Sequence, residues 1–316
     1  MRKDLQMKGK SIWNFLKDIA TQWLEDGPFQ LAAALSYYTL FSLAPILIIA
    51  IAVAGLFFGH EAATNQIVHT LQSLVGQESA KAIQEMIQNA SSKPKTGIIS
   101  TVLGIGVLIF GAGGVVGQLQ SSLNRIWGVT SKPGRGIWSF MWERFVSLAM
   151  VLGVGFLLLV SLVITTILTH LTLYIGSLIG GAAIIAYLLD IVVSFGFVTI
   201  LFAMIYKFLP DVRIQWKDVW IGAALTSFLF TVGKFLIGLY LGTSGVTSSF
   251  GAAGSLITVL LWVYYSALIF FLGAEFTQIY ASRYGSGVVP AENAVPIAAI
   301  PESERRESPP PEKRSA

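Results

Sequence analysis

Apolar residues gather in six long stretches of the chain, and shorter polar segments separate these stretches. Each stretch has about 20 residues or more, the length that a helix needs to cross roughly 30 Å of hydrocarbon. Inside lipid the backbone must satisfy its own hydrogen bonds, which favours helices over strands for runs of this length. The pattern predicts an all-α membrane protein with about six transmembrane helices, at residues 31–58, 98–117, 145–169, 183–206, 219–241 and 254–280.

A shorter amphipathic helix is expected before the first span, at residues 11–26. Its apolar residues recur at helical spacing and share one face; they are Ile12, Phe15, Leu16, Ile19, Trp23 and Leu24. Gly27 and Pro28 should end this helix. Two interpretations stay open: the helix lies in the cytoplasmic interface of the membrane, or it packs on the underside of the protein's own bundle.

The remaining segments complete the expected organisation. Pro45 lies near the middle of the first span and should kink that helix, because it removes a backbone donor. The connector at 59–97 favours one or two amphipathic helices on the outer side. From residue 285 the chain becomes rich in Pro, Glu and Arg, which is typical of disorder. We therefore expect a membrane domain at 1–284 and a disordered cytoplasmic tail at 285–316.

Composition agrees with a membrane location, and the distribution of charge predicts the orientation of the chain in the membrane. Hydrophobic residues make up 54% of the chain and charged residues only 12%, against about 25% charged in soluble proteins. Seventeen Lys and Arg residues fall in the termini and alternate connectors that would share one side, and three fall on the other side. Seven of the eight tryptophans also lie on the cation-rich side. This positive-inside pattern predicts that both termini are cytoplasmic.

Two ionisable residues fall deep inside predicted spans, where a charge costs several kcal/mol. Asp190 and Lys234 both lie roughly 10 Å below the outer ends of their helices, at 1.5 Å rise per residue. We expect them to pair or to share a small polar cavity. Such a pair would bind a substrate or a proton, or it would only fix the register of the two helices. In a third interpretation Lys234 extends alone to the interface.

A polar cluster is expected at the cytoplasmic end of the bundle. It combines Glu275, near the end of the last span, with side chains that follow the Gly-rich second span, namely Gln118, Gln120, Asn124 and Arg125. Glu275 should be a structural anchor paired with a cation, such as Arg125, Arg144 or Lys207. The other side chains either solvate a helix end or contact a lipid headgroup or solute. Gly113 and Gly117, four residues apart, predict a close contact with a neighbouring helix.

The sequence lacks the motifs of catalysis and cofactor binding. It has no cysteine, and its three histidines are scattered. Neither a metal-binding HExxH, a GxSxG nucleophile motif nor a phosphate-binding glycine motif is present. A basic face with interleaved aromatic residues, typical of nucleic-acid binding, is also missing. We therefore predict no metal, no cofactor, no nucleic-acid partner and no enzymatic activity.

Four stretches of the sequence resemble the YihY/BrkB family of bacterial inner-membrane proteins. They are LAAALSYYTLFSLAPILIIAIAVAGLFFG, FGAGGVVGQLQSSLNRIWGV, YKFLPDVRIQWKDVWIGAALTSFLFTVGKFLIGLYLG and FGAAGSLITVLLWVYYSALIFFLGAEFTQIYA. The resemblance runs in order from about residue 11 to residue 284, and it implies a six-helix protein of the bacterial inner membrane. It also implies a part in serum resistance or lipid handling. Members have carried the label ribonuclease BN, and the family offers no established catalytic residues to carry over.

Function is therefore expected to be transport. The leading hypothesis is a transporter or flippase-like protein for a lipid or other amphiphilic solute, with the bilayer as its surroundings. No ATP-binding motif is present, so a gradient or another subunit would drive it. The alternative is a non-transporting envelope scaffold or assembly factor that acts through its N-terminal helix and tail. A ribonuclease is disfavoured, because no metal-ligand or acid–base constellation for phosphodiester cleavage is present.

Overall fold

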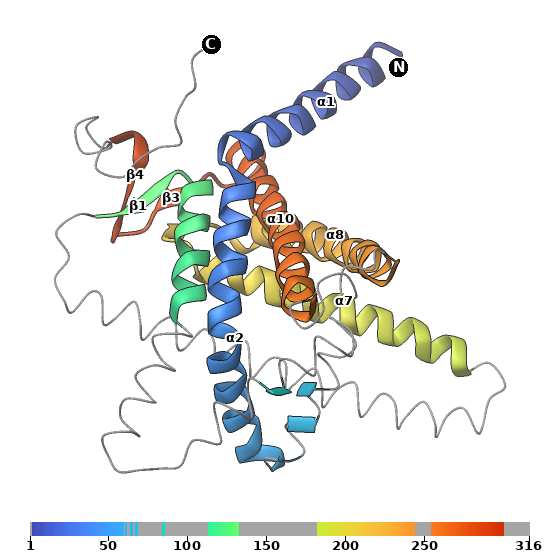
Figure 1. The fold of residues 1–316 in the computed structure, drawn as a ribbon. Coiled ribbons are helices and arrows are strands. Elements are labelled where there is room, and N and C mark those ends of the chain that lie inside the picture. Colours follow the sequence, from blue (N-terminus) through green and yellow to red (C-terminus); the bar gives the residue numbers. More distant parts are fainter. Residues whose placement is uncertain are drawn as a thin grey trace.

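The computed structural model describes residues 2–59, 113–132, 182–243 and 254–299, together with a few short pieces between residues 61 and 85. Most of the predicted second span, all of the predicted third span and residues 300–316 lie outside the described residues. So does most of the connector at 59–97. What was expected of these segments stays a prediction. The part that is described is mostly helical (Figure 1).

Four of the predicted spans are helices, and each ends within three residues of its predicted bounds. They are α2 (Pro28–Phe58), α7 (Ala182–Phe208), α8 (Trp216–Thr243) and α10 (Gly254–Arg283). Within the described residues, three segments are long and apolar enough to cross a membrane: Ile191–Phe208, Trp216–Leu241 and Leu256–Arg283. Uninterrupted apolar runs thus form long helices, as the run lengths predicted.

The predicted N-terminal helix is α1 (Arg2–Glu25), which starts nine residues earlier than expected. It meets α2 at a sharp elbow (Figure 1). Gly27 has a φ of 67°, a left-handed conformation that glycine adopts at little cost. Pro28 follows as the first residue of α2, where its missing N–H costs no helical hydrogen bond. The Gly-Pro pair therefore ends one helix and starts the next.

Helices α8 and α10 pack closely through a reciprocal arrangement of glycine and threonine. On α8, Thr226 Oγ1 donates to the carbonyl of Gly222, and on α10, Thr277 Oγ1 donates to the carbonyl of Gly273. Each threonine rests on the glycine of the other helix, because a Cβ atom at Gly222 would lie 2.7 Å from Thr277 Cβ and one at Gly273 would lie 2.8 Å from Thr226 Cβ. Small residues four apart let two membrane helices approach in this way.

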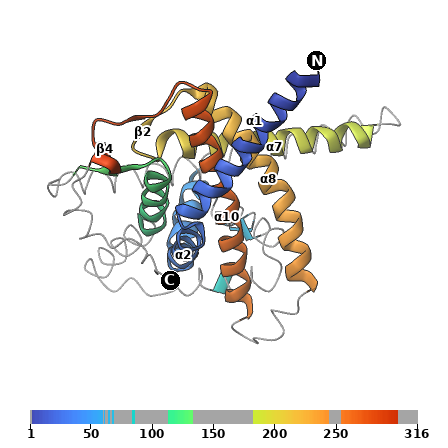
Figure 2. The same cartoon turned by 90° about the horizontal axis from the view of Figure 1, so that it is seen from above.

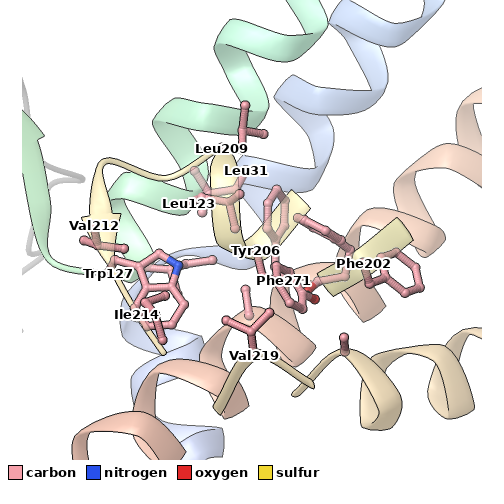
Figure 3. Close-up of a cluster of buried hydrophobic side chains, with 14 of the residues drawn as sticks. Leu31, Leu123, Trp127, Phe202, Tyr206, Leu209, Val212, Ile214, Val219 and Phe271 are labelled. Atoms are coloured by element: carbon pink, nitrogen blue, oxygen red, sulfur yellow. The ribbon is translucent and has the colours of Figure 1, made fainter. Parts of the chain in front are cut away.

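A helix at residues 113–126 runs beside α2, and its last turns enter the main apolar core (Figures 1 and 3). Leu123 and Trp127 pack there with Tyr206 and Phe271, all at most 3% exposed. The predicted role of the glycines of this helix is only partly testable. Gly114 approaches Tyr38 of α2, whereas no described residue lies within 4 Å of a Cβ placed at Gly117.

The chain after α10 is ordered as far as residue 299, and this corrects the predicted boundary of the disordered tail. Residues 285–299 contain two short strands and a 3₁₀ helix, η2 (Ile297–Ala299). Strand β3 (Val289–Pro290) pairs antiparallel with β2 (Val212–Arg213), and β4 (Ala294–Pro296) pairs antiparallel with β1 (Val129–Ser131). The fold is therefore not purely helical. Composition alone indicated disorder, but distant strands supply the missing hydrogen-bond partners.

A buried aspartate fixes where the chain leaves α10. Asp218, in the first turn of α8, accepts hydrogen bonds from the backbone N–H of Ser286 at 3.0 Å and from its hydroxyl at 2.7 Å. Gly285 makes room for this contact, since a Cβ atom there would lie 2.5 Å from the carboxylate. The contact directs residues 286–299 across the end of the bundle towards β1 and β2.

The described parts of the segments that were predicted to share the cytoplasmic side lie at one end of the molecule. The strands join the segments at 129–131, 212–213 and 289–296, and α1 crosses the same end (Figures 1 and 2). An ion pair between Asp18 of α1 and Arg283 of α10 ties this helix to the bundle. The alternation of connectors between two sides, and which side of a membrane this end faces, stay predictions.

Candidate functional site at the α1–α2 elbow

A pair of carboxyl groups lies where the elbow meets α10. Glu275 is only 1% exposed, and its carboxyl group lies beside that of Asp26, the residue before Gly27. Two ionised carboxylates this close would repel each other and have no donor between them, which favours one proton shared by the pair. The second oxygen of Glu275, Oε2, is buried and has no hydrogen-bond partner among the described residues.

Arg125 is the cation of this site, and it acts on Asp26. It comes from the helix at 113–126 and attracts the Asp26 carboxylate electrostatically. Its guanidinium lies against the elbow, because a Cβ atom at Gly27 would be 3.6 Å from Arg125 Nη2. We call these four residues, Asp26, Gly27, Arg125 and Glu275, the elbow site. Sequence reasoning expected a cation as the partner of Glu275, whereas the elbow places a second acid beside it.

Burial controls the protonation of Asp26. Removal from water raises the pKa of this carboxyl above its ordinary value of 3.8, and this cause outweighs the attraction of Arg125 and the hydrogen bond with Glu275, which lower it. The nearby charge of Glu25 raises the pKa further. Asp26 therefore keeps its proton to a higher pH in the folded protein than in the unfolded chain.

This raised pKa makes a prediction about stability and pH. The folded protein binds more protons than the unfolded chain between the ordinary value and the raised pKa, so stability falls as pH rises through that window. We expect the melting temperature of the detergent-solubilised protein to fall more steeply above about pH 4 for the wild type than for Asp26→Asn. The exposed carboxylate of Glu292 offers the control, because Glu292→Gln should keep the wild-type slope. Equal slopes for all three proteins would contradict the assignment.

A second polar cluster surrounds Asp211, in the turn between α7 and α8, and joins three separate segments. The carboxylate accepts hydrogen bonds from Asn124 and Asn293 at 2.8 Å each, and from Gln120 and Ser131 at 3.4 Å each. The backbone N–H of Asp211 in turn donates to Asn124 Oδ1 at 2.8 Å. All four side-chain donors are neutral. We call this group the Asp211 cluster, and its geometry is that of a clamp between chain segments.

The predicted cytoplasmic cluster is thus divided between two places. Arg125 and Glu275 belong to the elbow site, while Gln120 and Asn124 bind Asp211. Gln118 stays within its own helix and donates to Ser122 Oγ at 3.2 Å.

Sequence reasoning missed four members of these sites: Asp26, Asp211, Ser131 and Asn293. The first two carry a readable signal, since Asp26 precedes Gly-Pro at a span boundary and Asp211 follows Leu209-Pro210 at another.

The other predicted site residues are not brought into either cluster. Lys234 is an exposed residue of α8, and Asp190 lies in α7 with its side chain outside the described residues. Figures 1 and 2 show α7 and α8 diverging towards the ends that carry these two residues. Their pairing stays a prediction. Helix α2 continues through Pro45 without a break, and the expected kink also stays a prediction.

The remaining predicted cation partner of Glu275 within the described residues is bound elsewhere. Lys207 donates to the carbonyl of Ile214 and lies 5.7 Å from the centre of the Trp216 ring. Among the described residues, no group of three or more His, Cys, Asp or Glu side chains could hold a metal ion. The chemistry that the elbow site itself offers is the binding and release of a proton between two carboxyl groups beside an arginine.

Comparison with known proteins agrees with a membrane protein. The chain is 26% identical over 277 residues to a protein of Saccharophagus degradans described as a UPF0761 membrane protein, covering 86% of this chain and 61% of the relative. Similar membrane proteins occur in Pseudoalteromonas translucida, with 27% identity and 78% and 79% coverage, and in Pseudomonas aeruginosa, with 25% identity and 82% and 61% coverage. The chain thus spans about three fifths of the length of several of these relatives. No solved structure matches it.

A family model covers both clusters. The model described as virulence factor BrkB matches residues 19–298, from the last two turns of α1 to η2. This match includes Asp26, Arg125, Asp211 and Glu275, and it extends past α10 to the two strands that sequence reasoning had assigned to a disordered tail. The chain therefore belongs to the BrkB family of membrane proteins.

Proposed function

We propose that this protein moves a lipid or other amphiphilic solute across the membrane, and that the Asp26–Glu275 pair binds the coupling proton. One observation carries the proposal: a carboxyl group of a membrane-spanning helix is fully buried against a second carboxyl group. Such a group costs several kcal/mol inside a membrane protein, and its presence there favours a role in ion or solute movement. The proposal involves no covalent catalysis.

The geometry of the elbow site suggests how a proton would change the structure. With the proton present, Asp26 is bonded to Glu275 and holds the elbow against α10. Without it, two carboxylates would repel each other, and Arg125 would draw Asp26 away from Glu275. Because Asp26 precedes the hinge at Gly27, this exchange of partners would tilt α1 and the start of α2 relative to α10.

The choice of an amphiphile rests on where the site lies. Glu275 is eight residues from the end of the span at Arg283, which is about 12 Å along a helix. That depth is just below the level of lipid headgroups. Tyr37 and Phe41, in the α2 helix that follows the elbow, are 59% and 63% exposed. A molecule with a polar head and an apolar tail would match such surroundings.

The test is lipid movement in reconstituted vesicles. Fluorescent phosphatidylglycerol in the inner leaflet becomes accessible to dithionite only if the protein moves it outward. We expect the wild type to accelerate this movement under a pH gradient, and Glu275→Gln and Asp26→Asn to reduce the rate to that of protein-free vesicles. Glu292→Gln, an exposed carboxylate, is the matched control and should keep the wild-type rate.

Two further variants separate the elbow site from the predicted intramembrane pair. Asp190→Asn and Lys234→Met should slow lipid movement only if that pair takes part. A wild-type protein that moves neither lipid nor another amphiphile would count against transport. If crosslinking then captured one stoichiometric partner that is lost on deletion of residues 1–26, a scaffold function would replace the proposal.

A further inference from the structure

Helix α1 has two apolar edges, and only one of them packs against the protein. Phe15 and Ile19 face the bundle: Ile19 is buried, and the Phe15 ring lies 5.6 Å from the rings of both Phe276 and Tyr284. The other edge is open. Trp13, Leu16 and Leu24 are 69%, 52% and 58% exposed.

The two edges are adjacent on the helix surface and form one continuous apolar half. At about 100° per residue, Phe15, Ile19 and Trp23 occupy one quarter of the circumference, and the next quarter contains Leu16, Ala20, Trp13 and Leu24. The opposite half is polar and carries Asn14, Lys17, Asp18, Thr21, Gln22 and Glu25. Helix α1 therefore has three surfaces: one packs against the protein, one is apolar and open, and one is polar and suited to water.

The height of α1 along the bundle is fixed by its contacts. It touches α10 at Phe276, two turns before the end of the span, and at Tyr284, just after it, and it pairs with Arg283, the last residue of the span. It also leads directly into α2 through the elbow (Figure 1). The open edge of α1 therefore lies beside the end of the α10 span, at the level expected for the membrane boundary.

We infer that α1 lies in the headgroup layer of the membrane, with Trp13, Leu16 and Leu24 inserted among the acyl chains and the polar half towards water. The occupant of the open edge is thus lipid rather than protein. Five Lys and Arg residues against three acidic residues in α1 favour a surface that contains anionic lipid.

An aromatic cluster where α7 ends and α8 begins fits the same boundary. Trp216 and Trp220, at the start of α8, are both partly exposed, and Trp216 contacts the ring of Phe208 at the end of α7. Lys207 lies over the Trp216 ring. Tryptophan beside lysine at a span end is typical of the membrane interface. The boundary would therefore pass through both α1 and this cluster.

The absence of cysteine from the chain allows a direct test by single-site spin labelling. Leu16→Cys and Leu24→Cys would report on the open edge, and Asn14→Cys and Thr21→Cys, also exposed, on the polar half. The full chain would be reconstituted in vesicles of phosphatidylcholine and phosphatidylglycerol in equal amounts. Collision with oxygen, which dissolves in acyl chains, would be compared with collision with a water-soluble nickel complex.

We expect the oxygen-to-nickel collision ratio to be several-fold higher at residues 16 and 24 than at residues 14 and 21. Equal, water-like ratios at all four sites would overturn the inference. So would labels at 16 and 24 that are shielded from both reagents and broadened by a label on a second copy, because the open edge would then be a protein interface. Neither result depends on whether the protein transports anything, so the inference stands or falls separately from the proposed function.

Discussion

Replacing Gly222 or Gly273 with alanine is expected to lower the free energy of unfolding by about 3 kcal/mol, the upper part of the range for overpacked sites. The added Cβ atom would meet the Cβ of the facing threonine at 2.7 or 2.8 Å, and the hydroxyl even more closely. Turning the threonine away is not free, because Thr226 and Thr277 bond their own helix backbone. The two helices would have to separate, which weakens the packing around Tyr206 and Phe271.

The measurement is equilibrium unfolding in mixed detergent micelles, with Gly238→Ala as the control. Gly238 lies in the same helix, α8, and no described residue lies within 4 Å of a Cβ atom there. This substitution should be neutral or slightly stabilising, since alanine favours helix by up to about 1 kcal/mol. If Gly238→Ala and Gly222→Ala had the same effect, the close packing of α8 and α10 would be refuted.

Asp211→Ala is expected to lower the free energy of unfolding by a similar amount, about 3 kcal/mol. The substitution removes the common acceptor of four side-chain donors, and the buried amide of Asn124 would be left without its partner. An unsatisfied buried polar group costs about 1–3 kcal/mol, and several lose their acceptor here. The loss should also free residues 289–296 from β1 and β2, because Asn293 connects that segment to the cluster.

Limited proteolysis would detect this release as new cleavage between residues 286 and 299, and unfolding in micelles would give the energy. The matched control is Glu292→Ala. Glu292 lies beside Asn293 but forms an exposed ion pair with Arg213, and such pairs contribute only about 0–1 kcal/mol. Stability and cleavage similar to the wild type in Asp211→Ala would show that the cluster does not hold the segment.

The elbow site shows how far sequence reasoning reached in locating function. Glu275 stood out because a charge in an apolar run is costly wherever the run folds. Its partner could not be found from the sequence, because Asp26 is almost 250 residues away and looks like an ordinary residue before a turn. The Asp211 cluster was likewise predicted only in part. Gln120 and Asn124 were identified as polar residues at a helix end, but the aspartate that binds both was not.

The α8–α10 contact had a signal in the sequence, but the sequence did not identify the two helices that meet. The Gly-x-x-x-Thr spacing occurs at residues 222–226 and again at 273–277, so the signal was present in the sequence. The sequence analysis favoured the richer glycine pattern at 104–117; in its described part Gly114 approaches Tyr38 of α2, whereas no described residue lies within 4 Å of a Cβ atom at Gly117. A small-residue spacing marks a face that allows close approach, but it does not say which helix approaches.

By itself, the sequence determined the length and position of the helices and the break between α1 and α2. Hydrocarbon forces long apolar runs to satisfy their own backbone, and Gly-Pro has few conformations. Only the tertiary structure decided that Asp26 meets Glu275, that four neutral donors surround Asp211, and that the segment after α10 is ordered. Each of these depends on groups far apart in the chain, whose meeting is set by packing rather than by local preference.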